Sequence, residues 1–250
     1  MQIVIPSSGR AASIRHDTLA LFPTAQVCVD ESEADTYSQV VDPAQLLIHP
    51  ALSGLPSIRN WIVKNIEDDI IFMVDDDIIE MQSMVGRNAM SYRDRNVIMT
   101  IVENAADCAV GIGATIFGFN QSPRPMAFLP YDPISLAFWV GTAIGVTGKT
   151  LKWDERLRLR GDVDVCMQAL LVDRIVFTDR RFHFLSRKRF KSKGGSASFR
   201  SAERDKQEVD YLKHKWGRYI EMRVNHGMGS GKTRSATIFT PSPVVRRRQR

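Results

Sequence analysis

The stretch Phe72–Glu80 reads FMVDDDIIE, an apolar run that stops on three consecutive aspartates and then resumes. Residues 70–74 are β-branched, aromatic and otherwise apolar, a composition typical of a buried strand. A strand that ends in carboxylates delivers them to the carboxyl edge of a sheet, where α/β folds bind ligands. The sequence therefore predicts a ligand site at Asp75, Asp76 and Asp77.

The same three aspartates predict a metal. Adjacent carboxylates repel one another and lose hydration unless they share a cation, and a set of oxygen ligands favours Mg²⁺ or Mn²⁺. Alternate side chains of a strand point the same way, so Asp75 and Asp77 are expected on one side and Asp76 on the other. The competing interpretation is a solvated acidic turn that binds nothing.

The chain before the triplet alternates short apolar strands with helical stretches. Strands are predicted at residues 3–5, 25–29, 44–48 and 70–74, and helices at residues 12–22, 33–40 and 57–66, the last with Ser57 as its N-cap. This alternation predicts an α/β fold in which crossover helices connect a largely parallel, nucleotide-binding sheet.

The second part of the chain is less regular. We expect a helix at 96–108, a proline-rich loop at 121–133, a strand at 135–146, a helix at 162–172 and a last strand from Ile175. A basic, Gly/Ser-rich loop follows Arg187, and then a helix at 203–222 and a disordered tail. The expected organisation is a catalytic domain at 1–186 and a basic, helical C-terminal extension at 187–250 that packs on it.

Charge is distributed very unevenly. The 250 residues have ordinary proportions of hydrophobic (44%) and charged (25%) residues, as in soluble globular proteins. Residues 1–180 contain 15 Lys and Arg against 23 Asp and Glu, a net charge of −8, whereas residues 181–250 contain 19 against 5, a net charge of +14. A polyanion, most commonly nucleic acid, is the partner that such a basic segment favours, and a tail that only aids solubility is the alternative.

The remaining composition favours the cytoplasm. No apolar stretch is long enough to span a membrane, and the N-terminal MQIVIPSSGR predicts a first strand instead of a signal peptide. Three cysteines, an odd number in apolar segments, suit a reducing compartment better than a disulfide framework.

Several motifs together resemble one enzyme family. They are IPSSGR at 5–10, VDESEADTY at 29–37, RNWIVKN at 59–65, DDDI at 75–78 and WDERLRLRGDVDVCMQALL at 153–171. They resemble the phage TET-associated glycosyltransferases, which have the GT-A fold and modify hydroxymethylated pyrimidines in DNA, and the resemblance covers residues 1–184. It implies a GT-A-type sheet and, for a phage-encoded enzyme, the cytoplasm of the host.

The resemblance also implies roles for individual residues. Asp77 would be the main metal ligand and Asp75 would face the nucleotide, with a third metal ligand from a C-terminal histidine, either His183 or, preferably, the glycine-flanked His226. The residues expected to contact the nucleotide sugar are Pro6, Ser7, Ser8, Arg10, Asp30, Arg59, Asn60, Asp75 and Asp76. Plain surface charge is the alternative for the two arginines, and a turn carboxylate is the alternative for Asp30.

The catalytic base is expected at the start of a helix. The family pattern there is Glu-Asp-x-Asp, and this chain has Gly161-Asp162-Val163-Asp164, which leaves Asp162 or Asp164 as the base. A carboxylate that takes the proton of an acceptor hydroxyl implies direct, inverting displacement. The alternative is that the two aspartates only cap the helix.

These features predict a metal-dependent, inverting glycosyltransferase. Its donor would be a nucleotide sugar, UDP-linked, and its acceptor the hydroxyl of a hydroxymethylpyrimidine in DNA, such as hydroxymethylcytosine. A base must leave the duplex, or be single-stranded, to reach a buried donor. Two alternatives stay open: transfer to a saccharide or protein, with the basic tail on an acidic membrane surface, and a nucleic-acid-binding α/β module without enzymatic activity.

Overall fold

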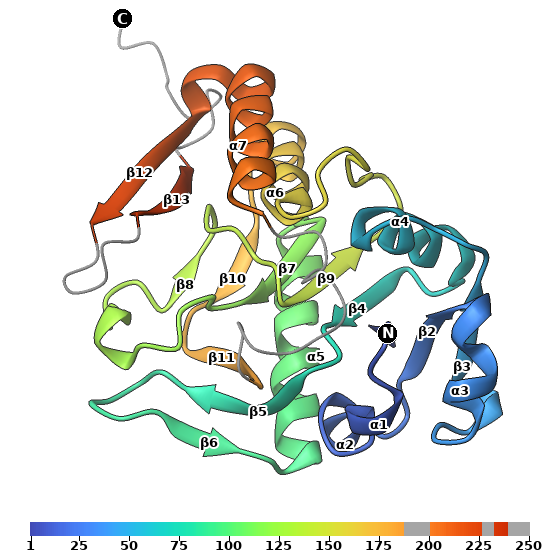
Figure 1. Ribbon diagram of the computed structural model, residues 1–250. Coiled ribbons are helices and arrows are strands. Elements are labelled where there is room, and N and C mark those ends of the chain that lie inside the picture. Colours follow the sequence, from blue (N-terminus) through green and yellow to red (C-terminus); the bar gives the residue numbers. More distant parts are fainter. Residues whose placement is uncertain (188–200, 227–232, 240–250) are drawn as a thin grey trace, which may run out of the picture.

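The computed structural model describes residues 1–187, 201–226 and 233–239, with side chains left undescribed at 127, 202, 221–226 and 233–239. Within these residues an eight-stranded sheet forms the centre of the molecule (Figure 1), in the order β3-β2-β1-β4-β9-β7-β10-β8. Its strands are β1 (Gln2–Pro6), β2 (Gln26–Asp30), β3 (Leu46–His49), β4 (Ile70–Val74), β7 (Ile116–Phe119), β8 (Ile134–Ser135), β9 (Ala143–Thr147) and β10 (Phe177–Asp179).

The first four strands are all parallel, as the alternating sequence predicts. Strand β1 lies between β2 and β4, with Val4 opposite both Gln26 and Met73. Strand β9 is antiparallel to both β4 and β7, so the sheet is mixed beyond β4. The α/β class and the parallel first half of the sheet are therefore confirmed.

Helices cover both faces of the sheet. They are α1 (Ala11–Ile14), α2 (Thr18–Leu21), α3 (Ala34–Ser38), α4 (Leu55–Asn65), α5 (Arg95–Gly111), α6 (Gly161–Val172) and α7 (Ala202–Trp216). Alternate residues of the strands feed two cores: Ile3 and Ile5 pack in the core that contains residues of α5, and Val4 packs in the core that contains residues of α4 and α6. This alternation buries an apolar layer on each side of the sheet.

Two smaller sheets flank the large one. Strands β11 (Phe182–Ser186), β5 (Ile78–Ser83) and β6 (Met90–Tyr92) form the first, and β12 (Ile220–His226) and β13 (Thr233–Phe239) form an antiparallel hairpin. Strand β5 begins one residue after the aspartate triplet, so the triplet connects the large sheet to the small one.

The predicted helix at 12–22 is wrong, because the chain forms two short helices with a break at Arg15–Asp17. The side chains at the break make tertiary hydrogen bonds. Asp17 pairs with Arg187, and the Thr18 hydroxyl donates to Asp75 O and accepts from Ile78 N–H. Ser57 is not an N-cap either: α4 begins two residues earlier, Gly54 is its N-cap, and the Ser57 hydroxyl donates to Ser53 O.

The strand predicted at 135–146 is also wrong, because an irregular segment separates β8 from β9. Residues of that segment bond to other elements: Gly141 O accepts from Arg59, and Phe138 O accepts from the Thr178 hydroxyl. The single strand predicted from Ile175 is in fact two, β10 in the large sheet and β11 in the small one.

The C-terminal part is helical only in its first section. Helix α7 ends at Trp216, where Gly217 has φ 56°, a backbone conformation that glycine adopts without strain. The predicted helix to residue 222 is therefore wrong, and a hairpin strand starts at Ile220. The expected basic loop and disordered tail fall at 188–200 and 240–250, outside the described residues. Among the described helices, none is long and apolar enough to cross a membrane.

Candidate active site

The site forms where β1 and β4 end side by side. Because these strands are parallel neighbours, the loop after Pro6 and the triplet after Val74 reach the same edge of the sheet. Two backbone hydrogen bonds fix the loops, Ser7 N–H to Cys28 O (2.9 Å) and Asp75 N–H to Thr142 O (3.0 Å). Arg10, the last residue of the first motif, and Asp75, the first residue of the triplet, are 65 positions apart in sequence, and the two motifs thereby become neighbours.

Asp76 points into the protein. Its carboxylate accepts a hydrogen bond from the Ser7 hydroxyl (2.6 Å) and interacts with the Ser8 backbone N–H. Arg10 places its Nε 3.3 Å from Asp76 Oδ1 and its Nη1 2.9 Å from Asp77 Oδ2. The Tyr37 hydroxyl, 2.7 Å from the Ser7 hydroxyl, completes this group. The first-strand motif and the triplet thus form one hydrogen-bonded unit.

Asp75 points toward α6 instead. Arg59 of α4 is almost fully buried, with 1% of its surface exposed, and joins two carboxylates. Its Nη2 lies 3.5 Å from Asp75 Oδ1, and its Nη1 donates to Asp162 Oδ1. Its Nη2 also donates to Gly141 O (3.3 Å). Arg59 therefore brings the triplet and the first turn of α6 to one place.

Burial dominates the electrostatics of these carboxylates. It raises the pKa of Asp75 to about 8, against the opposing charge of Arg59, and the pKa of Asp76 to about 6, against Arg10. The contacts divide the triplet differently from the expectation, because Asp76 and Asp77 both contact Arg10 whereas Asp75 contacts Arg59. Burial also raises the pKa of Asp162, opposed by Arg59 and by the nearby Trp153 indole N–H.

The two candidate bases face different ways. Asp162 faces Arg59 and the triplet, with 25% of its side chain exposed. Asp164 is fully buried on another side of α6, where it accepts hydrogen bonds from Trp216 Nε1 (2.8 Å) and Lys215 Nζ (2.9 Å) of α7. Neither caps the helix, because the N-cap residue is Arg160 and it has no side-chain capping bond.

Other predicted residues lie at the edge of the site or away from it. Asp30 ends β2 and accepts from the Ser32 hydroxyl (2.6 Å), which lowers the pKa of Asp30. Asn60 lies on α4 and holds the backbone of Trp153 through its side-chain oxygen (2.8 Å) and nitrogen (3.0 Å). It therefore does not reach the aspartates, because its amide is used to fix the loop before α6. Both Arg59 and Asn60 lie inside α4.

The histidine predictions have different outcomes. His226 ends β12, and its side chain lies outside the described residues. His183 is buried in β11, where its Nδ1 lies 2.7 Å from the backbone oxygen of Asn120. Among the described residues, no three His, Cys, Asp or Glu side chains are arranged to hold a metal ion by themselves.

Three residues of the site were not predicted from the sequence. Gly141 packs against Asp162, because a Cβ added to it would lie 3.2 Å from Asp162 Oδ2 and 3.4 Å from Gln121 Oε1. Gln121 is buried and faces the Thr142 N–H at 3.4 Å. Tyr37 had one usable signal, since it is the aromatic residue of VDESEADTY, whereas a glycine and a glutamine in irregular segments carry no periodic signal.

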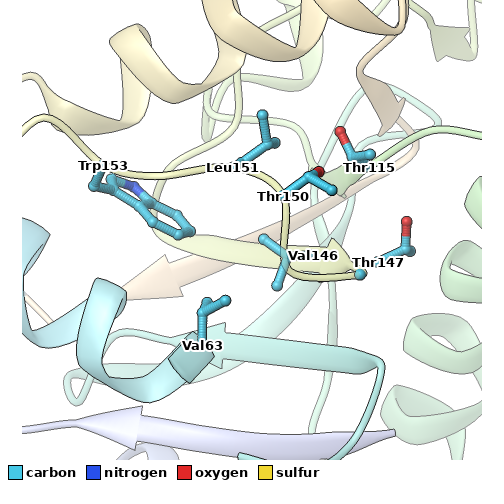
Figure 2. Close-up of a pocket in the computed structure, with 8 residues that line it drawn as sticks. Val63, Thr115, Val146, Thr147, Thr150, Leu151 and Trp153 are labelled. Atoms are coloured by element: carbon cyan, nitrogen blue, oxygen red, sulfur yellow. The ribbon is translucent and has the colours of Figure 1, made fainter. Parts of the chain in front are cut away.

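A small hollow lies beside α4 and β9 and is separate from this carboxylate group. Figure 2 shows its lining, with the Trp153 ring and Val63 near one end and Thr115 and Thr147 near the other. None of its lining residues is charged, and none is one of the site aspartates or arginines. We assign it no part in the chemistry.

Comparison with known protein families shows the family of this chain. The model of the TET-Associated Glycosyltransferase family matches residues 1–195. The chain belongs to this family. The match covers both the aspartate triplet and Asp162, and it confirms that the protein is a glycosyltransferase.

Solved structures show the fold of this glycosyltransferase. Glucosyl-3-phosphoglycerate synthase from Mycobacterium tuberculosis, solved with Mg²⁺ and UDP, is 10% identical with a TM-score of 0.50, over 96% of this chain and 86% of that one. A second mycobacterial protein is 12% identical with a TM-score of 0.50, over 98% of this chain and 87% of that one. The expected GT-A fold is thus confirmed. No curated protein sequence matches the chain.

Proposed function

We propose that this glycosyltransferase moves a sugar from a UDP-linked nucleotide sugar to the hydroxymethyl oxygen of a 5-hydroxymethylpyrimidine in DNA, with inversion and with Mg²⁺ or Mn²⁺. The observation that carries the proposal is the Arg59 bridge, which joins Asp75 to Asp162 at one end of the sheet. It gives a single site both a carboxylate cluster for the donor and a carboxylate for the acceptor.

The residues present fit a divalent cation. Four carboxylates, those of the triplet and Asp162, face the two arginines Arg10 and Arg59, and the raised pKa values of Asp75 and Asp76 indicate that these arginines alone do not stabilise all the negative charge. Mg²⁺ is commonly held by one or two carboxylates together with substrate phosphates, so Asp75 and Asp77 would hold the ion with the donor diphosphate. The bound ion would stabilise the charge that develops on the leaving diphosphate. The similar mycobacterial synthase was solved with Mg²⁺ and UDP.

Asp162 is the proposed base. Its oxygen takes the proton of the acceptor hydroxyl while that hydroxyl attacks the anomeric carbon and the nucleoside diphosphate leaves from the opposite face. A pKa raised by burial favours this role, because a carboxylate with a pKa nearer neutrality binds the proton more strongly. Asp164 is the weaker candidate because Lys215 and Trp216 already occupy its two oxygens.

The charge distribution supports DNA as the acceptor. The basic stretch that begins at Arg187 leaves the core at the triplet: the Arg187 N–H donates to Asp77 O (2.7 Å), and its side chain pairs with Asp17. A net charge of +14 over residues 181–250 thus starts beside the donor site, where it can attract a phosphate backbone.

The test is incubation with hydroxymethylated DNA and a panel of nucleotide sugars, including UDP-glucose, in the presence of Mg²⁺ or Mn²⁺. Mass spectrometry of the released nucleosides should show a hydroxymethylpyrimidine that has gained the sugar mass. The product should be absent with EDTA and with Asp77→Ala. Donor hydrolysis without modified nucleosides, or transfer only to saccharides or proteins, would reject DNA as the acceptor.

Two further variants test which aspartate, Asp162 or Asp164, is the catalytic base. Asp162→Asn should lower turnover at least about 10²-fold while donor binding is kept, because only proton transfer is removed. Asp164→Asn should act mainly on thermal stability, since it loosens contacts to α7. A larger loss of turnover in a folded Asp164→Asn protein would reverse the assignment.

A further inference from the structure

Helix α7 is hydrogen-bonded to the chain segment that precedes Asp162. The Glu208 side chain, 5% exposed, accepts three successive backbone N–H bonds, from Arg158 (2.9 Å), Leu159 (2.9 Å) and Arg160 (3.0 Å). Successive N–H groups that converge on one anion form a strong, directional anchor. Arg160 is the N-cap residue of α6, so this anchor ends two residues before Asp162.

Other polar residues of α7 contact the same segment. Asp205 receives two hydrogen bonds from the Arg160 guanidinium, at 2.9 and 3.0 Å. Tyr211 donates to Asp154 (2.7 Å), and Lys215 lies between Asp154 and Asp164. Figure 1 shows α7 lying along α6. One face of α7 is therefore bonded to the loop before α6 and to α6 itself.

The contacts fix α6 from the side away from the triplet. Asp164 bonds to α7, and Asp162, two residues earlier, bonds to Arg59 of α4. The first turn of α6 is held between these two helices, and the direction of Asp162 depends on both. Helix α7 lies outside the part that the family model matches, which ends at residue 195.

We propose that Glu208 is a positioning residue that aims the Asp162 carboxylate at the acceptor hydroxyl by fixing residues 158–160. The inference rests on the proposed function, in which Asp162 is the base. A displacement of a reacting group by about 1 Å costs roughly 10²-fold in rate. Glu208 therefore contributes to turnover without contacting the donor or the acceptor.

The test is Glu208→Gln, which keeps the size of the side chain but removes its charge and one acceptor oxygen. We expect kcat to fall about 10- to 100-fold while KM for the nucleotide sugar and binding of UDP change less than about twofold. Backbone amides of residues 158–160 should exchange hydrogen at least about tenfold faster. Asp210→Asn, an equal charge change at an exposed position of α7, should change none of these values.

A double-mutant cycle separates positioning from general loosening. In the Asp162→Asn protein, Glu208→Gln should lower kcat by less than about twofold further, because no base is left to aim. Equal losses in both backgrounds, or no loss in either, would overturn the inference. Asp205→Asn, which weakens the contact to the Arg160 side chain and leaves Glu208 in place, gives a milder variant if Glu208→Gln does not fold, and it should also lower kcat.

The cycle also distinguishes the inference from the proposed function. Full turnover in Asp162→Asn would remove the base assignment, and the positioning role would fall with it. Loss of turnover in Asp162→Asn together with unchanged turnover in a folded Glu208→Gln protein would overturn the inference alone.

Discussion

At the scale of single residues, Arg59 holds the site together. It is a buried cation that contacts two carboxylates and the carbonyl of Gly141. Loss of one partner of a buried ion pair leaves an uncompensated charge and commonly costs about 3–5 kcal/mol. Asp162 also packs against Gly141, so the position of its carboxylate depends on how closely the backbone at Gly141 can approach it.

Gly141→Ala tests this close approach. The added Cβ would lie 3.0 Å from the Trp139 ring and 3.2 Å from Asp162 Oδ2, so Asp162 must shift by a few tenths of an ångström. We expect turnover to fall about tenfold or more with only a small loss of stability. Gly111→Ala in α5 is the control, because its Cβ would meet nothing within 4 Å. Unchanged turnover in Gly141→Ala would show that the site tolerates displacement there.

Asp75 makes the stability of the metal-free protein depend on pH. The unfolded chain releases the Asp75 proton at about pH 4, whereas the folded protein retains it up to about pH 8. Between these values the folded state binds more protons, so its free energy of unfolding falls as pH rises and levels off above about pH 8. Asp76, with a pKa of about 6, adds to the fall below that pH.

Asp75→Asn should reduce the decrease in the free energy of unfolding as pH rises. In EDTA, we expect the variant to be at least as stable as the wild type at pH 8 and above, because it carries no carboxylate to ionise there. Urea unfolding at several pH values from 5 to 9 measures the difference. Addition of Mg²⁺ should stabilise the wild type more than the variant, and identical pH slopes for the two proteins would contradict the prediction.

At the scale of elements, α7 docks through charged contacts as well as through apolar ones. Besides the buried Leu212, its inner face bonds to Asp154, Arg160 and Asp164. Asp154 accepts from Arg156, Tyr211 and Lys215, and the hydrogen bonds from Arg156 lead the effects that hold its pKa well below the usual range. Docking of α7 should therefore weaken in acid.

Asp154→Asn tests that acid sensitivity. A depressed pKa means that the contribution of Asp154 is fully present above its ordinary pKa near about 4 and is lost as pH falls below it. At pH 7 the variant should be less stable by about 1–2 kcal/mol, and the difference should shrink as pH approaches 2. Thermal unfolding of the two proteins at pH 7, 4 and 2.5 measures it.

Glu103→Gln provides the matched control for that comparison, because Glu103 is an exposed carboxylate on α5. Its stability difference from the wild type should stay small at every pH. A constant difference between Asp154→Asn and the wild type across the range would mean that the charge of Asp154 is not what holds α7.

At the scale of the whole molecule, opposite charges separate along the chain. Residues 1–180 supply the acidic site, and the basic residues 181–250 begin at the triplet, where Arg187 bonds to Asp77 O and to Asp17. Arg187 is thus bonded to the folded domain at the triplet, with 57% of its side chain exposed.

Neutralisation of Lys188, Arg189, Lys191 and Lys193 to glutamine should weaken DNA binding. Each phosphate contact removed should flatten the slope of log affinity against log salt by about 0.9 for duplex DNA or about 0.7 for single strands. A variant that ends before the RRRQR tail should lose less, and UDP binding should be unchanged in both. Fluorescence titration at several salt concentrations measures the slopes, and unchanged affinity in both variants would favour a saccharide or protein acceptor.

Local pattern in the sequence determined the nucleotide-binding half. Short apolar runs between helical stretches predict β1, β2, β3 and β4 to within two residues, and the carboxylates after Val74 follow directly from where β4 ends. The helix at Gly161–Val172 was equally readable, because a mostly apolar stretch follows a polar loop there. These features depend on neighbours a few positions apart, so periodicity is sufficient to find them.

Only the tertiary structure decided which side chains meet. Arg59 and Asp162 are 103 positions apart, and Glu208 lies 48 positions from Arg160, so no periodicity connects them. The break at Asp17 and the separation of β8 from β9 have the same origin, since side chains and carbonyls there bond to distant elements. A site built from the ends of several elements is determined by packing, and packing alone separated the partly exposed Asp162 from the fully buried Asp164.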